Sequence, residues 1–311
     1  MNDASPHTIR RYATVVRDFL AWYVVEYGCS LSFDGLVPTV VIAYRNQLQT
    51  LRQPSTVNVH ISALRTWGTW LEAEGYVAHN PTQRLKIVGH AGTARIPHGL
   101  ADRAINGLLA EAQRTGARAY AIVMLLLQSG LRIGECAALY WGDITLGERS
   151  GDMLVRSGKG RKTRVVPLTL SARQALATYA APILGASSPS LKDVVAVWPH
   201  GSHAQASRPI WQTRKRHVRA ALTDTAIRRI IAILVRLCEA RGFLPPHSKV
   251  SAHTFRHTFA MAYLTAHPGD LAGLATILGH ATLDTTRIYA NPTTDQLRQR
   301  MEGLALNAYG D

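Results

Sequence analysis

The chain has 311 residues, of which 47% are hydrophobic and 18% charged, a balance typical of a folded globular protein rather than a disordered one. Lys and Arg number 35 against 20 Asp and Glu, so the net charge is +15, and 29 of the basic residues are Arg. This surplus indicates a polyanionic partner, nucleic acid first, and Arg grips phosphate better than Lys does. The apolar runs are too short to span a bilayer, residues 1–11 carry no apolar signal region, and the three cysteines lie far apart. The sequence therefore predicts a cytoplasmic protein without a membrane span, a disulfide framework or a cysteine zinc site.

The first 88 residues are predicted to be helical. Apolar residues recur at helical spacing after Pro6: Ile9, Tyr12, Val16, Phe19, Leu20 and Tyr23. A second helix is predicted over 40–51, and a third begins at Ser55 and ends before Gly75. Residues 86–99 contain four Gly or Pro and no strong period. We therefore expect a helical domain at 1–88, a linker at 89–98 and a second domain at 99–311.

The second domain is predicted to be mostly helical with one small β-hairpin. Helices over 101–113 and 117–128 come first, and the second is so apolar that it should be buried. Short strands are expected at 153–156 and 164–168, on either side of the glycine-rich basic turn 157–163. Helices return from about residue 171 and continue to the end. The predicted fold class is therefore mainly α with a small β-sheet or hairpin.

Arg132 follows the apolar helix and Gly130, a residue that favours a reversal of the chain. The next helix would begin beside Arg132, and the N-terminus of a helix attracts anions. The alternative is an Arg at a helix end that only extends into solvent.

His253 and Arg256, at i and i+3, lie on one face of a predicted helix, and His257 follows at i+4 from His253. A His pair at this spacing can bind zinc, but Arg256 repels a cation and the Glu of an HExxH motif is absent. We therefore predict no metal site, because an Arg beside a His suits an anionic phosphate instead. A solvated or capping pair is the alternative.

Three further residues each give a weak signal. Lys159 lies in the basic turn, where a Lys is usually only solubilising but can also reach over a bound backbone and donate a proton. His280 follows Leu278-Gly279 and is expected to begin a helix after a tight turn. Tyr289 comes nine residues later, and a Tyr in an amphipathic helix more often belongs to a core or an interface.

Taken together and in this order, these residues resemble those of the tyrosine recombinases, the phage integrase and Xer family. That family carries Arg, Lys, His-x-x-Arg, His or Trp, and Tyr, and the six positions are filled here by Arg132, Lys159, His253, Arg256, His280 and Tyr289. Further matches are Glu135, three residues after Arg132, the hairpin sequence 158–168 and the sequence 278–290. The resemblance covers nearly the whole chain, since residues 1–88 look like the family's SAM-like core-binding domain, which clamps DNA.

The resemblance implies site-specific DNA recombination, as in integration, excision or transposition, by strand cleavage without a metal or other cofactor. It implies that Tyr289 is the nucleophile and forms a 3′-phosphotyrosyl intermediate, with His253 as its base. Lys159 would protonate the leaving 5′-oxygen, and Arg132 and Arg256 would hold the two non-bridging oxygens.

Two residues have less direct implied roles. His280 would hydrogen-bond the phosphate or steer the nucleophile, and Glu135 would orient its neighbours.

The implied partner is double-stranded DNA with a specific recombination site. A homotetramer would bring two sites together, with a dimer on each, and exchange would pass through a Holliday junction. An accessory DNA-bending protein is a further candidate partner, and the nucleoid is the expected location. Whether the role is integration, transposition or dimer resolution stays open.

Residues 199–250 look longer than the usual family stretch and are rich in Arg, which indicates one or two added or extended helices. This region has three possible roles. It could form a DNA-contact face that includes Trp211, contact a neighbouring protomer, or simply be a solvated face. Further DNA contacts are predicted at Arg161, Lys162, Arg214, Lys215, Arg216 and Arg219.

Three other functions are alternatives to recombination. A type IB topoisomerase would use the same chemistry, but the N-terminal region looks recombinase-like. A catalytically silent DNA-binding regulator would have no use for Tyr289 so placed. A metal-dependent nuclease is disfavoured because no paired carboxylates lie near the histidines in the sequence.

Overall fold

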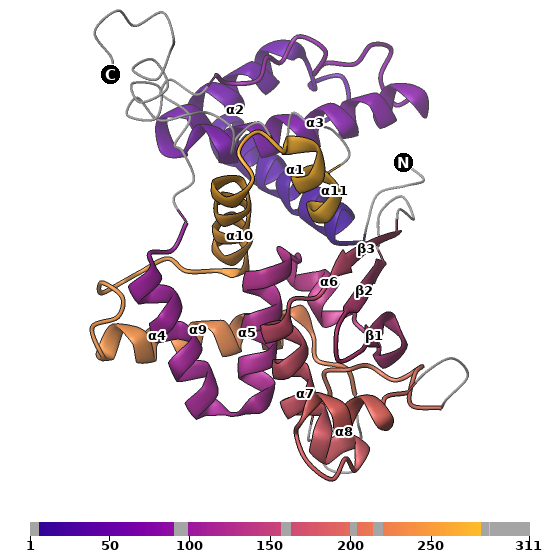
Figure 1. The fold of residues 1–311 in the computed structure, drawn as a ribbon. Coiled ribbons are helices and arrows are strands. Elements are labelled where there is room, and N and C mark those ends of the chain that lie inside the picture. Colours follow the sequence, from indigo (N-terminus) through magenta and orange to yellow (C-terminus); the bar gives the residue numbers. More distant parts are fainter. Residues whose placement is uncertain are drawn as a thin grey trace, which may run out of the picture. The chain divides into compact units, whose positions relative to one another are not determined.

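The computed structural model describes residues 6–89, 99–156, 163–199, 204–213, 220–280 and 286. The chain divides into two compact units, residues 1–95 and 96–311, and each has its own hydrophobic core. Helices dominate both units, and the second also carries a small sheet (Figure 1). The predicted mainly α fold is confirmed.

The first unit is built from helices α1 (Pro6–Tyr27), α2 (Pro38–Leu51) and α3 (Pro54–Ala73). Each begins with a proline, whose fixed φ suits the first turn of a helix, where its missing N–H is not needed. Helix α3 packs against both α1 and α2. Phe19 of α1 is fully buried and meets the ring of Tyr44 on α2 edge to face, with the ring centroids 5.1 Å apart.

The buried stripe of α1 differs from the predicted one. Val15, Phe19 and Tyr23 are buried at a spacing of four, whereas Ile9 and Leu20 are exposed. A helix at the surface of a small unit buries only one stripe, so apolar residues just outside that stripe face solvent.

The second unit is organised around α5 (Ala117–Ser129), as its apolar sequence predicts. It packs against α4 (Asp102–Thr115), α7 (Leu170–Leu184) and α10 (Ala252–Ala266). A helix that is apolar on all sides is stable only in an interior, and nine of the 13 residues of α5 are buried.

The sheet has three antiparallel strands in the order β1 (Ile144–Leu146), β2 (Gly151–Arg156) and β3 (Thr163–Pro167). Strands β2 and β3 form the predicted hairpin, in which Met153 is paired with Val166 and Arg156 with Thr163. The turn 157–162 lies outside the described residues. Strand β1 was not predicted, because three residues are too few to show an alternating pattern.

The described part of the second unit contains five further elements, of which α9 is the longest. They are α6 (Ile133–Ala137), the 3₁₀ turn η1 (Trp141–Asp143), α8 (Leu191–Ala196), α9 (Asp224–Ala240) and α11 (Leu271–Leu278). Helix α9 lies within the region 199–250, where an added helix was expected. The side chains of Ser190, Thr223 and Asp270 each accept a backbone N–H at the start of α8, α9 and α11, which fixes where these helices begin.

Of the alternatives for residues 199–250, a DNA-contact face that includes Trp211 does not hold for that residue. Its side chain is fully buried, and its indole N–H donates to the carbonyl oxygen of Cys136 at 2.8 Å. The segment around it folds back on the core, because Tyr140 forms an isolated β-bridge with Pro209. A Trp in an Arg-rich sequence is therefore a core residue here.

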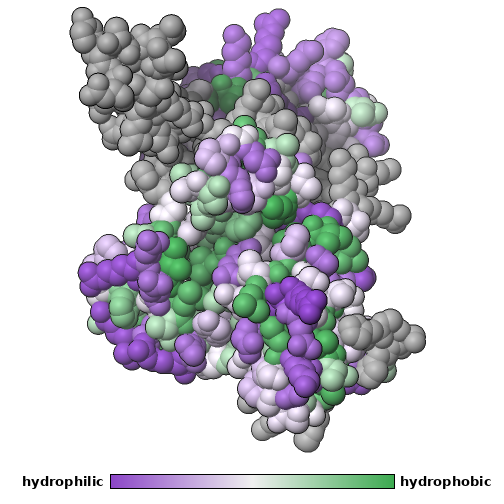
Figure 2. All heavy atoms as spheres, in the orientation of Figure 1, coloured by the Kyte–Doolittle hydropathy of each residue, from purple (hydrophilic) through white to green (hydrophobic). Residues whose placement is uncertain are grey.

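Within the described residues, no helix has the length and apolar character needed to cross a membrane. Figure 2 shows hydrophilic residues over the outer turns of α4 and apolar residues in the area between α4 and α10.

Candidate active site

Arg132 occupies the start of α6 at the point where α5 ends. Gly130 closes α5 with a φ of +61°, a conformation that glycine adopts without strain, and the chain reverses there. The carboxylate of Glu135 then accepts the backbone N–H of Arg132 at 2.8 Å and its guanidinium Nη1 at 3.0 Å. The side chain of Glu135 is only 8% exposed, whereas that of Arg132 is 44% exposed. The helix predicted to start beside Arg132 is confirmed, and its first turn holds this side chain at the surface.

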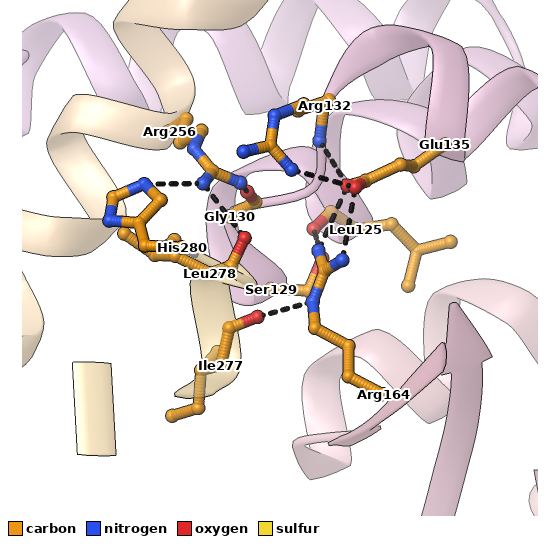
Figure 3. Close-up of polar contacts among 10 residues, drawn as sticks. All are labelled: Leu125, Ser129, Gly130, Arg132, Glu135, Arg164, Arg256, Ile277, Leu278 and His280. Carbon is orange, nitrogen blue, oxygen red and sulfur yellow. Dashed lines mark hydrogen bonds and ion pairs between the residues drawn. The ribbon is translucent and has the colours of Figure 1, made fainter. Parts of the chain in front are cut away.

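A second arginine, on the sheet, forms an ion pair with Glu135. Arg164 of β3 donates from Nη1 to Oε1 at 3.0 Å and from Nη2 to Oε2 at 2.9 Å. Burial alone would raise the pKa of Glu135, but the hydrogen bonds from Arg164 and from the Arg132 backbone, with the charges of both arginines, lower it. Glu135 is therefore ionised at neutral pH and keeps two guanidinium groups close together (Figure 3).

Arg256 of α10 is only 3% exposed and joins three segments of the chain. Its Nη1 donates to the carbonyl of Gly130 at 2.7 Å, and its Nη2 donates to the carbonyl of Leu278 at 2.8 Å. The Nη2 group also lies 2.8 Å from Nε2 of His280. The guanidinium is thus fixed between the end of α5 and the turn after α11 (Figure 3).

His280 follows the C-cap of α11, Gly279, whose φ is +65°. A guanidinium has only donors, so Nε2 of His280 accepts from Arg256 and the ring proton is on Nδ1. Nδ1 lies 2.7 Å from the hydroxyl of Thr286 and donates to it. Burial, together with the charges of Arg256, Arg132 and Arg164, lowers the pKa of His280 to about 4, so the ring is neutral. The helix expected to begin at His280 lies outside the described residues, apart from Thr286.

His253 and Arg256 both lie on α10, as predicted. The rings of His253 and His257 are stacked at 5.9 Å between centroids. Burial lowers the pKa of His253, and the charges of Arg256, Arg132 and Arg228 lower it further. The imidazole is therefore neutral at pH 7 and able to accept a proton.

Of the six residues expected in the site, Arg256 and His280 are in direct contact. The charges of Arg132 and Arg256 act on both His253 and His280, so these four residues influence one another electrostatically. The other two, Lys159 and Tyr289, lie outside the described residues. So do the expected DNA contacts Arg161, Lys162, Arg214, Lys215, Arg216 and Arg219.

The sequence reasoning overlooked Arg164, although its signal was present. Arg164 stands in the hairpin sequence 158–168 that helped to identify the resemblance, but no role was assigned to it.

Known proteins resemble this chain over most of its length. The model of the phage integrase family matches residues 100–296. The tyrosine recombinase XerC of Methylobacterium sp. (strain 4-46) is 30% identical over 311 residues, covering 96% of this chain and 87% of the relative. The tyrosine recombinase XerC of Pelobacter propionicus is 29% identical over 298 residues, covering 95% of this chain and 88% of the relative.

A solved structure supports the fold. The site-specific recombinase XerH bound to its difH substrate, in a pre-cleavage complex, matches with a TM-score of 0.66 at 19% identity, covering 94% of this chain and 78% of that one. The resemblance drawn from the residues is confirmed. The chain belongs to the phage integrase family and is a tyrosine recombinase, an enzyme of site-specific DNA recombination.

Proposed function

We propose that this recombinase cuts DNA without a metal, by attack of Tyr289 on a phosphodiester, and rejoins strands through a Holliday junction. The observation that carries the proposal is the assembly of Arg132, His253, Arg256 and His280 from segments far apart in the sequence. Attack by Tyr289 breaks the bond to the 5′-oxygen and leaves a 3′-phosphotyrosine and a 5′-hydroxyl. The bond energy is kept in the intermediate, so rejoining needs no ATP.

The charge around the four residues suits a phosphorane. Arg132, Arg164 and Arg256 contribute three positive charges and Glu135 one negative charge, which leaves a local charge of +2. A fixed guanidinium aimed at developing negative charge stabilises a transition state without reorganisation at the moment of reaction. In this proposal Arg132 and Arg256 hold the two non-bridging oxygens.

His253 is the proposed base for Tyr289. A phenol has a pKa near ~10 and therefore needs a base to lose its proton at neutral pH. Since burial and nearby arginines lower the pKa of His253, its ring is unprotonated and ready to accept that proton. Lys159, in the turn between β2 and β3, is the proposed donor to the leaving 5′-oxygen.

His280 has a different task in this proposal. Because its Nε2 accepts from Arg256, it steadies that guanidinium rather than taking a proton itself.

The binding of duplex DNA by two domains is part of the proposal. Residues 1–88 would clamp the duplex opposite the catalytic domain 99–311, with a dimer on each site and a tetramer on paired sites. Support comes from two solved structures of similar fold, an integrase of the Tn1549 transposon in complex with transposon right end DNA and a lambda integrase dimer bound to a core site. An accessory DNA-bending protein would assist pairing, and the nucleoid is where such an enzyme would meet its substrate.

A two-site plasmid assay tests the proposal. A preferred site is first selected from a randomised duplex pool and then cloned once or twice into a supercoiled plasmid. The proposal predicts deletion or inversion products that need two sites and are lost in Tyr289→Phe. Relaxation of the one-site plasmid without recombination of the two-site plasmid would instead indicate a topoisomerase, and tight binding without either reaction would indicate a silent regulator.

A further inference from the structure

Arg164 makes contacts that join three parts of the site. It lies at the start of β3, two residues after the turn 157–162, and its side chain is only 8% exposed. Both of its terminal nitrogens donate to the carboxylate of Glu135, and its Nε donates to the carbonyl of Ile277 at 2.7 Å. Ile277 lies in the last turn of α11, three residues before His280.

We infer that Arg164 is a positioning residue. It fixes strand β3, which follows the turn that contains Lys159, relative to Arg132 and His280. The inference rests on the proposed function, because it concerns the same site. Arg164 reaches Arg132 through the shared carboxylate of Glu135, and it reaches the His280 turn through the carbonyl of Ile277.

Only an arginine can make these contacts at once. The guanidinium presents a rigid planar fork that binds both oxygens of a carboxylate, and its Nε–H points in a third direction. A lysine has the same charge, but its single ammonium group does not match that geometry. Three acceptor atoms on two segments are therefore held by one planar group.

Arg164 also determines how Arg132 is held. With both oxygens of Glu135 occupied by Arg164, the carboxylate receives Arg132 through Nη1 and the backbone N–H. Arg132 keeps 44% of its side chain exposed in this arrangement. Without Arg164 the buried carboxylate would depend on Arg132 alone, and it would draw that guanidinium inward from where a phosphate would bind.

The fit between Arg164 and the turn before His280 is close. A Cβ atom added to Gly279 would lie 2.9 Å from Nη1 of Arg164 and 3.1 Å from its Cδ. The guanidinium thus packs directly on the backbone of the turn, so a displacement of Arg164 would be transmitted to His280.

The test compares two buried arginines in the same unit, using Arg164→Lys and the matched control Arg173→Lys. Arg173 of α7 is 6% exposed and donates to the carbonyls of Gly147 and Glu148, on a turn that joins β1 and β2. Full-length variants would be assayed for single-turnover cleavage at saturating DNA, for DNA affinity and for unfolding temperature. We expect Arg164→Lys to lower the cleavage rate by about 10²-fold, the size of loss that a small misplacement of catalytic groups causes. DNA affinity should stay unchanged, and Arg173→Lys should lower only the unfolding temperature.

A second variant separates positioning from general damage. Glu135→Gln keeps the size of the side chain and removes its charge, so it weakens the same link from the other side. Residues that act as one unit give non-additive losses, so Arg164→Lys should cost little further activity in the Glu135→Gln background. Equal cleavage rates for the two Arg→Lys variants, or additive losses in the double variant, would overturn the inference. If the wild-type protein formed no adduct dependent on Tyr289, the proposed function itself would fail, and the inference with it.

Discussion

Arg132 and Arg256 differ in burial, although both are proposed to bind the same phosphate. Arg132 is 44% exposed, whereas Arg256 is buried and donates to the carbonyls of Gly130 and Leu278. The exposed arginine can therefore be removed at little structural cost, and the buried one cannot.

We predict that Arg132→Ala and Arg256→Ala both slow strand cleavage by about 10²–10³-fold, since each removes a preorganised donor. Only Arg256→Ala should also destabilise the fold, by about 1–3 kcal/mol for each buried carbonyl left unpaired. Single-turnover kinetics and denaturant unfolding measure the two effects. Equal losses of stability in the two variants would contradict this division of roles.

The pH dependence of cleavage reports on His253. Its pKa is lowered from the ordinary value of 6.5 by burial first and by neighbouring arginines second. A neutral base is needed, so the rate should be independent of this group above pH 6.5 and fall only as the pH drops through the lowered pKa. In His253→Gln the fall in rate at low pH, the acid limb of the profile, should be absent. In the control His267→Gln, at the end of the same helix, the acid limb should remain. An acid limb that survives in His253→Gln would exclude His253 as the base.

The stability of the second unit should depend on His280. Its pKa is lowered to about 4 in the folded chain, against an ordinary value of 6.5. The unfolded chain therefore binds more protons between these values, so the free energy of unfolding falls as the pH drops from 6.5 towards 4. Denaturant titrations at several pH values should give a shallower decline for His280→Gln than for the wild type. An identical decline would mean that His280 does not contribute.

At the scale of elements, the end of α5 is the point where the site is assembled. Gly130 has a positive φ, and a Cβ atom added there would lie 2.6 Å from Cδ2 of Leu278 and 2.7 Å from Cδ1 of Phe259. The reversal after α5 therefore packs directly against α10 and α11.

Gly130→Ala and Gly185→Ala form a matched pair. Both glycines end a helix in the left-handed region, but a Cβ atom at Gly185 meets nothing within 4 Å. Gly185→Ala should cost about 1–2 kcal/mol through backbone strain alone. Gly130→Ala should cost about 1–3 kcal/mol more through overpacking, and cleavage should also suffer because Arg256 binds the Gly130 carbonyl. Equal unfolding free energies for the two variants would show that the close packing at Gly130 is relaxed without cost.

The longer elements were predictable because their signals are local. A proline marks the start of α1, and the apolar sequence of α5 fixes its place in the core. Helices α2 and α3 begin at Pro38 and Pro54, two residues and one residue before the predicted starts. The burial of Trp211 depends on a bridge between Tyr140 and Pro209, which no local pattern reveals.

In the site, too, contacts between residues far apart in the sequence could not be predicted. The order of Arg132, His253, Arg256 and His280 could be recognised along the chain, and in the structure the two arginines act electrostatically on both histidines. The role inferred for Arg164 could not be predicted from the sequence, because it depends on a contact with the carbonyl of Ile277, which is 113 residues away along the chain.

At the scale of the whole molecule, the net charge of +15 governs the encounter with DNA. We predict steeply salt-dependent binding, because each phosphate contact releases counterions and adds about −0.9 to the slope of log K against log salt. Replacing Arg214, Lys215 and Arg216 by Ala should make the slope shallower by about 1 for each residue that contacts a phosphate. Binding titrations between low and physiological salt measure this. An unchanged slope would remove these three residues from the DNA interface.

The measurement that tests the central claim most directly is a covalent trap. The protein would be incubated in EDTA with a randomised pool of nicked duplexes, beside Tyr289→Phe, and the products run on a denaturing gel. The account predicts a protein–DNA adduct with the wild type only, linked through a 3′-phosphate and accompanied by a free 5′-hydroxyl. An adduct that persists in Tyr289→Phe, or tight binding with no adduct from the wild type, would contradict it.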